Sequence, residues 1–179
     1  MEELLEIKRD ANLPTETLDG EKVSLYINVS GDLDSEEVRA LKPDGIGLLR
    51  TELLYMKNTS FPDEENQFKV YSGIVEKFDK DSSIIIRTLD IGADKQLPYF
   101  KMKNETNSFL GLRGIRFSLQ NQDIFITQLK AILRAAYNRN VKIMYPMVNN
   151  ISELREANKL LERAKEELKE ENKLYKEDI

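Results

Sequence analysis

Residues 84–95 of the sequence read Ile-Ile-Ile-Arg-Thr-Leu-Asp-Ile-Gly-Ala-Asp-Lys, and they decide the fold. Three consecutive β-branched residues predict a strand that is buried on both faces, which is typical of parallel sheets covered by helices. Charged residues follow directly, beginning with Arg87 and Asp90. Gly92 comes next and lets the backbone approach a ligand closely. Because ligands bind at the carboxyl ends of the strands in parallel α/β folds, this segment also predicts where a site lies.

The rest of the chain alternates between strand and helix patterns. Besides the central run, strands are predicted at residues 23–30, 46–50 and 141–148. A helix is predicted over residues 35–42, where Asp34 and Glu37 fit a capping box, and another from Pro62, where acidic residues follow in the first turn. Two more are predicted from Asp123 and from Ile151, where apolar residues recur at helical spacing. This order predicts a parallel sheet with right-handed crossovers.

Four strand–helix units in a row favour an α/β fold of the (β/α)8 TIM-barrel type, which needs roughly 250 residues. The 179 residues of this chain hold about the first four units. Asp-Gly at residues 19–20, between two extended stretches, predicts an N-terminal β-hairpin. The expected division is the end of a linker at residues 1–14 and the amino-terminal half of the barrel at residues 15–179.

Composition excludes several classes of function. The formal net charge of −5 does not attract nucleic acid or an acidic membrane, so a local basic cluster must hold any anionic ligand. The chain has no Cys and no His, which excludes disulfides, thiol nucleophiles, Ser-His triads and a phosphohistidine within it. It begins without a secretory signal and contains no apolar run of membrane-spanning length. We expect a cytoplasmic protein with neither nucleic acid nor membrane as a partner.

Arginines end two of the predicted strands. Arg50 and Arg87 are expected at the same mouth of a barrel, with Arg113 on a following loop or helix start. Guanidinium groups bind phosphate and carboxylate oxygens through paired hydrogen bonds, and Lys95 would add a point charge. Together these residues predict a site for a small anion.

The same residues have a simpler interpretation. Arg50 could pair with Glu52 or Asp90 and merely close the barrel rim, since structural ion pairs also occur at strand ends. Asp90 could orient Arg87, accept a proton or hold a metal through water, and its spacing favours a simple arginine partner. The carboxylate spacing here does not predict a metal site.

Three motifs carry a resemblance to a known family. They are Gly45–Met56 (GIGLLRTELLYM), Arg87–Lys95 (RTLDIGADK) and Asn107–Arg116 (NSFLGLRGIR). In this order they resemble the phosphoenolpyruvate-binding domain of the enzyme I family of the bacterial phosphotransferase system. The likeness extends from the Asp-Gly pair at residues 19–20 to residues 142–147. Pyruvate phosphate dikinase and phosphoenolpyruvate synthase share the fold, but residues 87–95 resemble the enzyme I form.

The resemblance implies a (β/α)8 barrel and a defined reaction. In the family, the phosphoryl group of phosphoenolpyruvate moves to a histidine on an upstream domain and then to the carrier protein HPr, for sugar uptake. Position by position, Arg50, Arg87, Arg113 and Lys95 match substrate-binding residues, and Arg87 and Asp90 match the catalytic part of the site. A magnesium ion would bridge phosphate and carboxylate while arginines neutralise the transferred group.

This chain also departs from the family. The carboxylates that hold magnesium, the acceptor histidine and a catalytic cysteine have no counterpart in it. The resemblance therefore implies part of a phosphotransferase that is inactive alone. Three alternatives remain. One is a self-associating half-barrel, whose exposed edges predict a homodimer. The others are a related phosphoenolpyruvate-utilising enzyme such as pyruvate phosphate dikinase and an unrelated lyase half-barrel.

Overall fold

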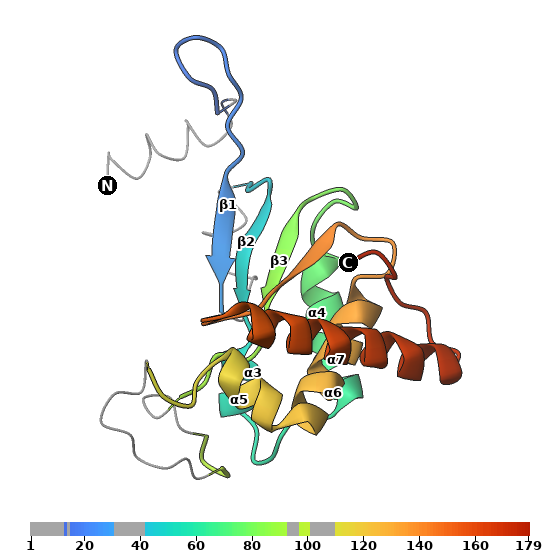
Figure 1. Cartoon of the computed structure of the whole chain (residues 1–179). Helices are drawn as coiled ribbons and strands as arrows, with labels where there is room; N and C mark the ends of the chain where they lie inside the picture. Colours follow the sequence, from blue (N-terminus) through green and yellow to red (C-terminus); the bar gives the residue numbers. More distant parts are fainter. Residues whose placement is uncertain (1–12, 14, 31–41, 93–96, 101–109) are drawn as a thin grey trace.

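The computed structural model describes residues 13, 15–30, 42–92, 97–100 and 110–179, which contain four strands and five helices (Figure 1). The strands are β1 (Tyr26–Val29), β2 (Gly45–Arg50), β3 (Ile84–Arg87) and β4 (Val141–Met144). The helices are α3 (Glu52–Met56), α4 (Glu64–Val75), α5 (Ile115–Gln120), α6 (Gln122–Ala135) and α7 (Ile151–Glu170).

The four strands form one sheet in the order β1-β2-β3-β4, and each neighbouring pair is parallel. The predicted α/β class with a parallel sheet is therefore confirmed. In Figure 1 the arrowheads of the labelled strands point toward the side of the molecule where α3 and α5 lie. The sheet is compatible with part of a barrel, and the closed (β/α)8 barrel stays a prediction.

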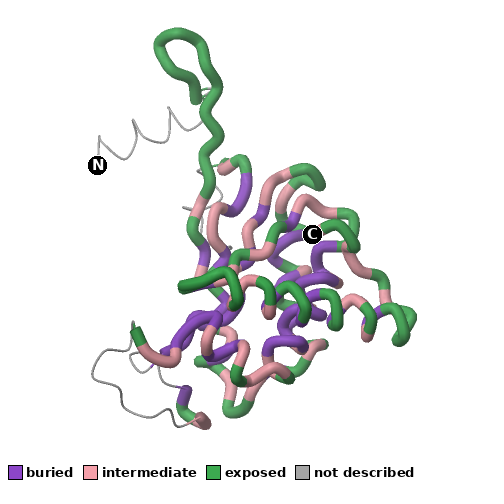
Figure 2. The backbone as a smooth tube through the Cα atoms, viewed as in Figure 1, coloured by how far each residue is buried: buried purple, intermediate pink, exposed green. Residues whose placement is uncertain are grey.

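One face of the sheet packs against α4 and α6. The core residues on this face include Ile46, Leu49, Ile84 and Ile86 from the strands and Tyr71, Ile74, Ala131 and Ile132 from the helices. The buried segments of Figure 2 gather where these layers meet. The expected burial of β3 on both faces is wrong, because Ile85 is only half-buried and its register partner Lys142 is exposed.

Capping side chains begin two of the predicted helices. Asp63 accepts a hydrogen bond from the backbone N–H of Asn66 (2.8 Å) at the start of α4. Asn150 accepts from the backbone N–H groups of Ser152 (2.9 Å) and Glu153 (3.0 Å) at the start of α7. These bonds satisfy N–H groups that have no partner within the helix. The predicted starts near Pro62 and at Ile151 are confirmed, while Asp123 lies in the first turn of α6, which begins one residue earlier.

Helix α7 packs on α6 through one apolar side. The buried residues on that side are Ala157, Leu160, Leu161, Ala164 and Leu168. Its other side carries exposed Glu, Lys and Arg residues, as its pattern predicts. Within the part of the chain that the structure describes, α7 and the other helices are all too short or too polar to cross a membrane.

Some boundaries differ from those predicted. Strand β4 ends at Met144 rather than residue 148, because Pro146 has no N–H to donate and Met147 has a positive φ of 61°. Helices α3 and α5 were not predicted, since five or six residues are too few for a helical pattern to show. Of the helix predicted over 35–42, all but its last residue lies outside the described residues.

The predicted N-terminal hairpin is represented by one isolated antiparallel bridge between Glu16 and Lys22. Gly20 takes a positive φ of 88° in the turn between them. The segment is exposed and extends away from the body in Figure 1. A hairpin of two full strands therefore stays a prediction. So does the division at residue 14, because most of residues 1–14 lie outside the described part.

An ion-pair network joins α4, α6 and the segment after α7. The Glu64 carboxylate contacts Lys130 Nζ (3.2 Å), Arg134 Nη1 (2.6 Å) and Lys173 Nζ (2.9 Å). Burial alone would raise the pKa of Glu64, but hydrogen bonds from these three cations outweigh it and lower that pKa. Charged groups that are partly removed from water stabilise a fold only when they are paired in this way.

This network predicts a loss of stability in acid. Hydrogen bonds from Lys130 and Lys173 lower the pKa of Glu171 to about 2, against an ordinary value of 4.5. Because folding lowers the pKa values of Glu64 and Glu171, their stabilisation is complete above pH 4.5 and is lost as the pH falls toward 2. Glu64→Gln should reduce the free energy of unfolding at neutral pH by about 2 kcal/mol, the cost of losing charged hydrogen bonds, and flatten the acid transition.

Urea denaturation at a series of pH values measures both effects. Glu166→Gln is the control, because Glu166 is exposed on α7 and belongs to none of the ion pairs in the described part of the chain. An acid profile of Glu64→Gln that overlays the wild-type profile would contradict the prediction.

Candidate functional site

Arg50 and Arg87 occupy equivalent places on neighbouring strands. They end β2 and β3, and their Cα atoms are partners in the parallel register. Leu49 and Ile86, one residue earlier, are 2% and 0% exposed in the core against the helices. Because side chains alternate along a strand, Arg87 extends from the face of the sheet opposite Ile86. The structure thus places the two strand-ending arginines side by side in the sheet.

Arg87 is held by two carboxylates. Its Nη2 atom donates to Glu52 Oε1, and its Nη1 atom lies 3.1 Å from Asp90 Oδ2. The side chains of Arg87, Glu52 and Asp90 are 16%, 6% and 5% exposed, so this group of charges is largely shielded from water. The alternative interpretation, in which Arg50 forms an ion pair with Glu52 or Asp90, is wrong. Arg50 is exposed and forms no ion pair with any residue that the structure describes.

Asp90 also binds a second arginine. Arg113 donates from Nε to Asp90 Oδ1 (3.0 Å) and from Nη2 to Asp90 Oδ2 (3.5 Å). Asp90 therefore lies between the guanidinium groups of Arg87 and Arg113. The interpretation of Asp90 as an arginine partner is confirmed, and both of its oxygens are engaged.

Two glycines near Arg113 leave no room for a side chain of their own. A Cβ atom on Gly92 would lie 3.1 Å from both Cγ and Cδ of Arg113, so the arginine stem packs directly on the Gly92 backbone. Gly114 has a φ of 55°, and a Cβ there would lie 2.9 Å from the carbonyl oxygen of Pro146. A residue with a side chain fits poorly at either position. The close approach predicted at Gly92 is therefore made by Arg113.

The charges of the described site do not cancel. Among the described residues, three arginines (Arg50, Arg87 and Arg113) and two carboxylates (Glu52 and Asp90) lie at this end of the sheet, which leaves a surplus of one positive charge. Arg87 Nε is buried and has no hydrogen-bond partner among the described residues. A chain with a net charge of −5 thus carries a local positive cluster at the carboxyl end of its sheet. Lys95, the remaining predicted member, lies outside the described residues.

Buried polar residues behind the arginines were missed in the sequence. Thr51 donates from its hydroxyl to the carbonyl oxygen of Arg87 (3.0 Å), and Gln128 of α6 accepts from the backbone N–H of Leu89 (2.9 Å). Thr51 and Gln128 are 2% and 1% exposed. A signal existed for Gln128, because it is a polar residue within the otherwise apolar side of α6.

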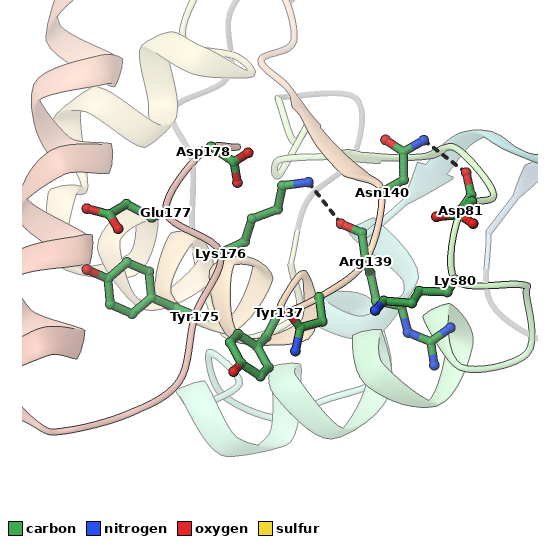
Figure 3. A pocket seen from close by; sticks show the side chains of 10 residues that line it. Lys80, Asp81, Tyr137, Arg139, Asn140, Tyr175, Lys176, Glu177 and Asp178 are labelled. Atoms are coloured by element: carbon green, nitrogen blue, oxygen red, sulfur yellow. Dashed lines mark hydrogen bonds between the residues drawn. The ribbon is translucent and has the colours of Figure 1, made fainter.

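Two hollows lie at different ends of the sheet. One of about 510 Å³ lies between the end of β2 and helices α3 and α4, and Arg50 is among its lining residues. Figure 3 shows another, of about 390 Å³, lined by residues 80–81, 137–140 and 175–178. There Lys176 Nζ donates to the carbonyl oxygen of Arg139 (2.9 Å), and Arg139 donates to the carbonyl oxygen of Phe78 (3.0 Å). This hollow lies at the amino ends of β3 and β4, away from the arginine cluster.

The family model and the curated proteins that match this chain all indicate the same family. Residues 5–179 match the family model described as PEP-utilising enzyme, PEP-binding domain. Phosphoenolpyruvate-protein phosphotransferase of Mycoplasma pneumoniae is 45% identical over 163 residues, which cover 91% of this chain and 28% of that protein. The protein of the same name from Bacillus subtilis is 42% identical over 168 residues, with 94% and 29% covered.

A third relative is the phosphoenolpyruvate-dependent phosphotransferase system protein of Salmonella typhimurium, which is 44% identical over 162 residues covering 90% of this chain and 21% of that protein. The chain spans less than a third of the length of these curated relatives. The resemblance found in the three sequence motifs is confirmed. Because the family model matches nearly the whole chain, the chain belongs to the PEP-utilising enzymes and carries sequence of their PEP-binding domain.

Proposed function

We propose that this chain supplies the arginine part of the phosphoenolpyruvate site of a phosphoenolpyruvate-protein phosphotransferase. The observation that carries the proposal is the Asp90 carboxylate between Arg87 and Arg113, beside Arg50 in the sheet register. The complete protein would transfer the phosphoryl group to an enzyme histidine and then to HPr, in the cytoplasm, for sugar uptake.

The chemistry of the arginines suits this substrate. Phosphoenolpyruvate carries a phosphate and a carboxylate, and guanidinium groups bind both through paired, charge-assisted hydrogen bonds. We assign substrate binding to Arg50, Arg87, Arg113 and Lys95. Arg87 would also stabilise charge on the transferred phosphoryl group, while Asp90 holds Arg87 and Arg113 in place within the catalytic centre. The surplus positive charge of the described site supports this assignment.

The residues of the described part do not fit a magnesium ion by themselves. They contain no group of three or more His, Cys, Asp or Glu side chains that would hold a metal. Glu52 and Asp90, the carboxylates nearest to the arginines, are bound to guanidinium groups. We propose that the ligands of the magnesium ion, like the acceptor histidine, lie outside this chain.

The purified chain should therefore not turn over phosphoenolpyruvate. It contains no histidine to accept the phosphoryl group. With phosphoenolpyruvate, Mg²⁺ and HPr present, a coupled assay of pyruvate release should give the background rate. The intact phosphoenolpyruvate-protein phosphotransferase of Bacillus subtilis serves as the active control. Magnesium-dependent release of pyruvate by the chain alone would contradict the proposal.

Binding tests the arginine assignment directly. In an NMR titration, the wild-type chain should bind phosphoenolpyruvate and shift its arginine side-chain resonances. Arg50→Ala and Arg87→Ala should each weaken this affinity about tenfold or more, because each removes a charged bidentate contact worth about 1.4 kcal/mol or more. The affinity should also fall with added salt, since the contacts are ionic.

Arg163→Ala is the matched control for this titration. Arg163 is a largely exposed arginine of α7 that pairs with Glu167, so its loss removes the same charge without touching the site. Wild-type protein that does not bind phosphoenolpyruvate, or affinities that are equal in all three variants, would refute the assignment.

A second function, self-association, is favoured by the open face of the sheet. On the face opposite α4 and α6, Tyr26 of β1 and Met144 of β4 are 48% and 44% exposed, and these two strands are the edges of the described sheet. Exposed strand edges and apolar side chains favour pairing with a second copy. We propose a homodimer in which two such faces cover each other.

Light scattering tests the homodimer. The wild-type chain should have the mass of a dimer at high protein concentration, and Met144→Glu should shift it toward monomer by placing a charge in the covered face. Glu166→Gln on the exposed side of α7 should leave the mass unchanged. A wild-type monomer at all concentrations would exclude this function.

A further inference from the structure

A buried polar side chain of α6 reaches the end of β3, directly behind the arginine cluster. Gln128 is 1% exposed, and the residues one turn away from it along α6 are all apolar (Ile124, Phe125, Ala131 and Ile132). Its Oε1 atom accepts from the N–H of Leu89 (2.9 Å), and its Nε2 atom donates to Thr51 Oγ1 (3.1 Å) and to the Tyr71 hydroxyl (3.2 Å). The side-chain amide of Gln128 thus connects α6 with Tyr71 of α4, with Thr51 after β2 and with Leu89 after β3.

These bonds replace the strand ladder where it ends. The last backbone bond between the two strands runs from Thr88 N–H to the carbonyl oxygen of Met144 (3.0 Å), and the carbonyl of Arg87 and the N–H of Leu89 beside it need other partners. Thr51 Oγ1 donates to the carbonyl oxygen of Arg87 (3.0 Å), and Gln128 accepts from Leu89 N–H. The backbone is thereby held on both sides of Thr88, between the two residues that form the Arg87–Asp90 pair.

A second buried glutamine shows what a purely structural amide does in the same layer. Gln67 of α4 accepts from the hydroxyls of Tyr55 (2.9 Å) and Tyr71 (3.1 Å) and donates to the carbonyl oxygen of Pro62 (2.9 Å). It is 0% exposed, but none of these partners belongs to β3 or to the arginine cluster. Gln67 and Gln128 are matched in type and burial and share the Tyr71 hydroxyl as a partner, but only Gln128 bonds Thr51 and the backbone that follows β3.

We propose that Gln128, acting through Thr51 and the backbone of residues 87–89, is a positioning residue for the Arg87–Asp90 pair and hence for the anion site. The inference rests on the proposed function, because it assigns a role within the phosphoenolpyruvate site. Binding groups must be held within about 0.5 Å of their working geometry, and a polar second layer supplies that constraint. The buried amide costs burial energy that an apolar residue at this position would avoid, so its bonds to the strand end account for its presence.

The experiment compares four variants by three measurements. Gln128→Leu and Thr51→Val remove the contacts to the strand end, Thr51→Ser restores the hydroxyl, and Gln67→Leu is the matched control. Each is measured for phosphoenolpyruvate affinity by NMR titration, for the Arg87 Nε–H resonance and for melting temperature. We expect affinity about tenfold lower and a moved Arg87 resonance in Gln128→Leu and Thr51→Val, since small displacements of binding groups have large effects. Thr51→Ser should stay near wild type.

Gln67→Leu decides between positioning and stability. It should lower the melting temperature about as much as Gln128→Leu while leaving the affinity and the Arg87 resonance unchanged. If Gln128→Leu behaves like Gln67→Leu, Gln128 is only structural and the inference is wrong, although the proposed function stands. If Gln128→Leu does not fold, the comparison of Thr51→Val with Thr51→Ser tests the inference instead. A lower affinity and a moved Arg87 resonance in Thr51→Val alone would support positioning, and unchanged values in both variants would contradict it.

The two proposals fail differently. Wild-type protein that does not bind phosphoenolpyruvate refutes the proposed function, and the Arg87 resonance still reports whether Gln128 and Thr51 position that side chain. An Arg87 resonance that is the same in wild type, Gln128→Leu and Thr51→Val overturns the positioning role, whatever the substrate.

Discussion

The structure depends on one buried carboxylate between two guanidinium groups. Asp90 is 4% exposed and Arg113 is 6% exposed, so neither charge is solvated well enough to exist there unpaired. Their pairing with each other and with Arg87 makes the arrangement tolerable, and removal of one member would leave a buried charge without compensation. The close packing of Arg113 on Gly92 and the turn at Gly114 are the local geometry that this pairing requires.

The parallel sheet separates stability from chemistry within a few residues. Ile84 and Ile86 enter the core against α4 and α6, whereas Arg87, one residue later, extends from the other face and the strand ends. Period-two alternation therefore lets a single short strand supply both the core and the site. Because all four strands run the same way, their carboxyl ends lie at one end of the sheet, where the charged residues of β2 and β3 meet.

Much of this arrangement was predictable from local patterns. The isoleucine run predicted β3, the acidic first turn after Pro62 and the apolar spacing from Ile151 predicted where two helices begin, and the strand–helix order predicted the parallel sheet. The failures have physical causes. Burial of β3 on both faces assumed a second covering layer, yet Ile85 is half-buried beside the exposed Lys142, and β4 ends early because Pro146 cannot continue a ladder.

The sequence by itself determined the class of the sheet and the position of Arg50 and Arg87 at strand ends, because these follow from periodicity between near neighbours. Only the tertiary structure decided that Asp90 pairs with Arg113, which lies 23 residues away along the chain. It also decided that Gln128 forms hydrogen bonds with Leu89, 39 residues away, and with Thr51, 77 residues away. Such contacts join side chains across separate elements. Their geometry depends on how the helices pack on the sheet, and spacing along the chain does not encode that packing.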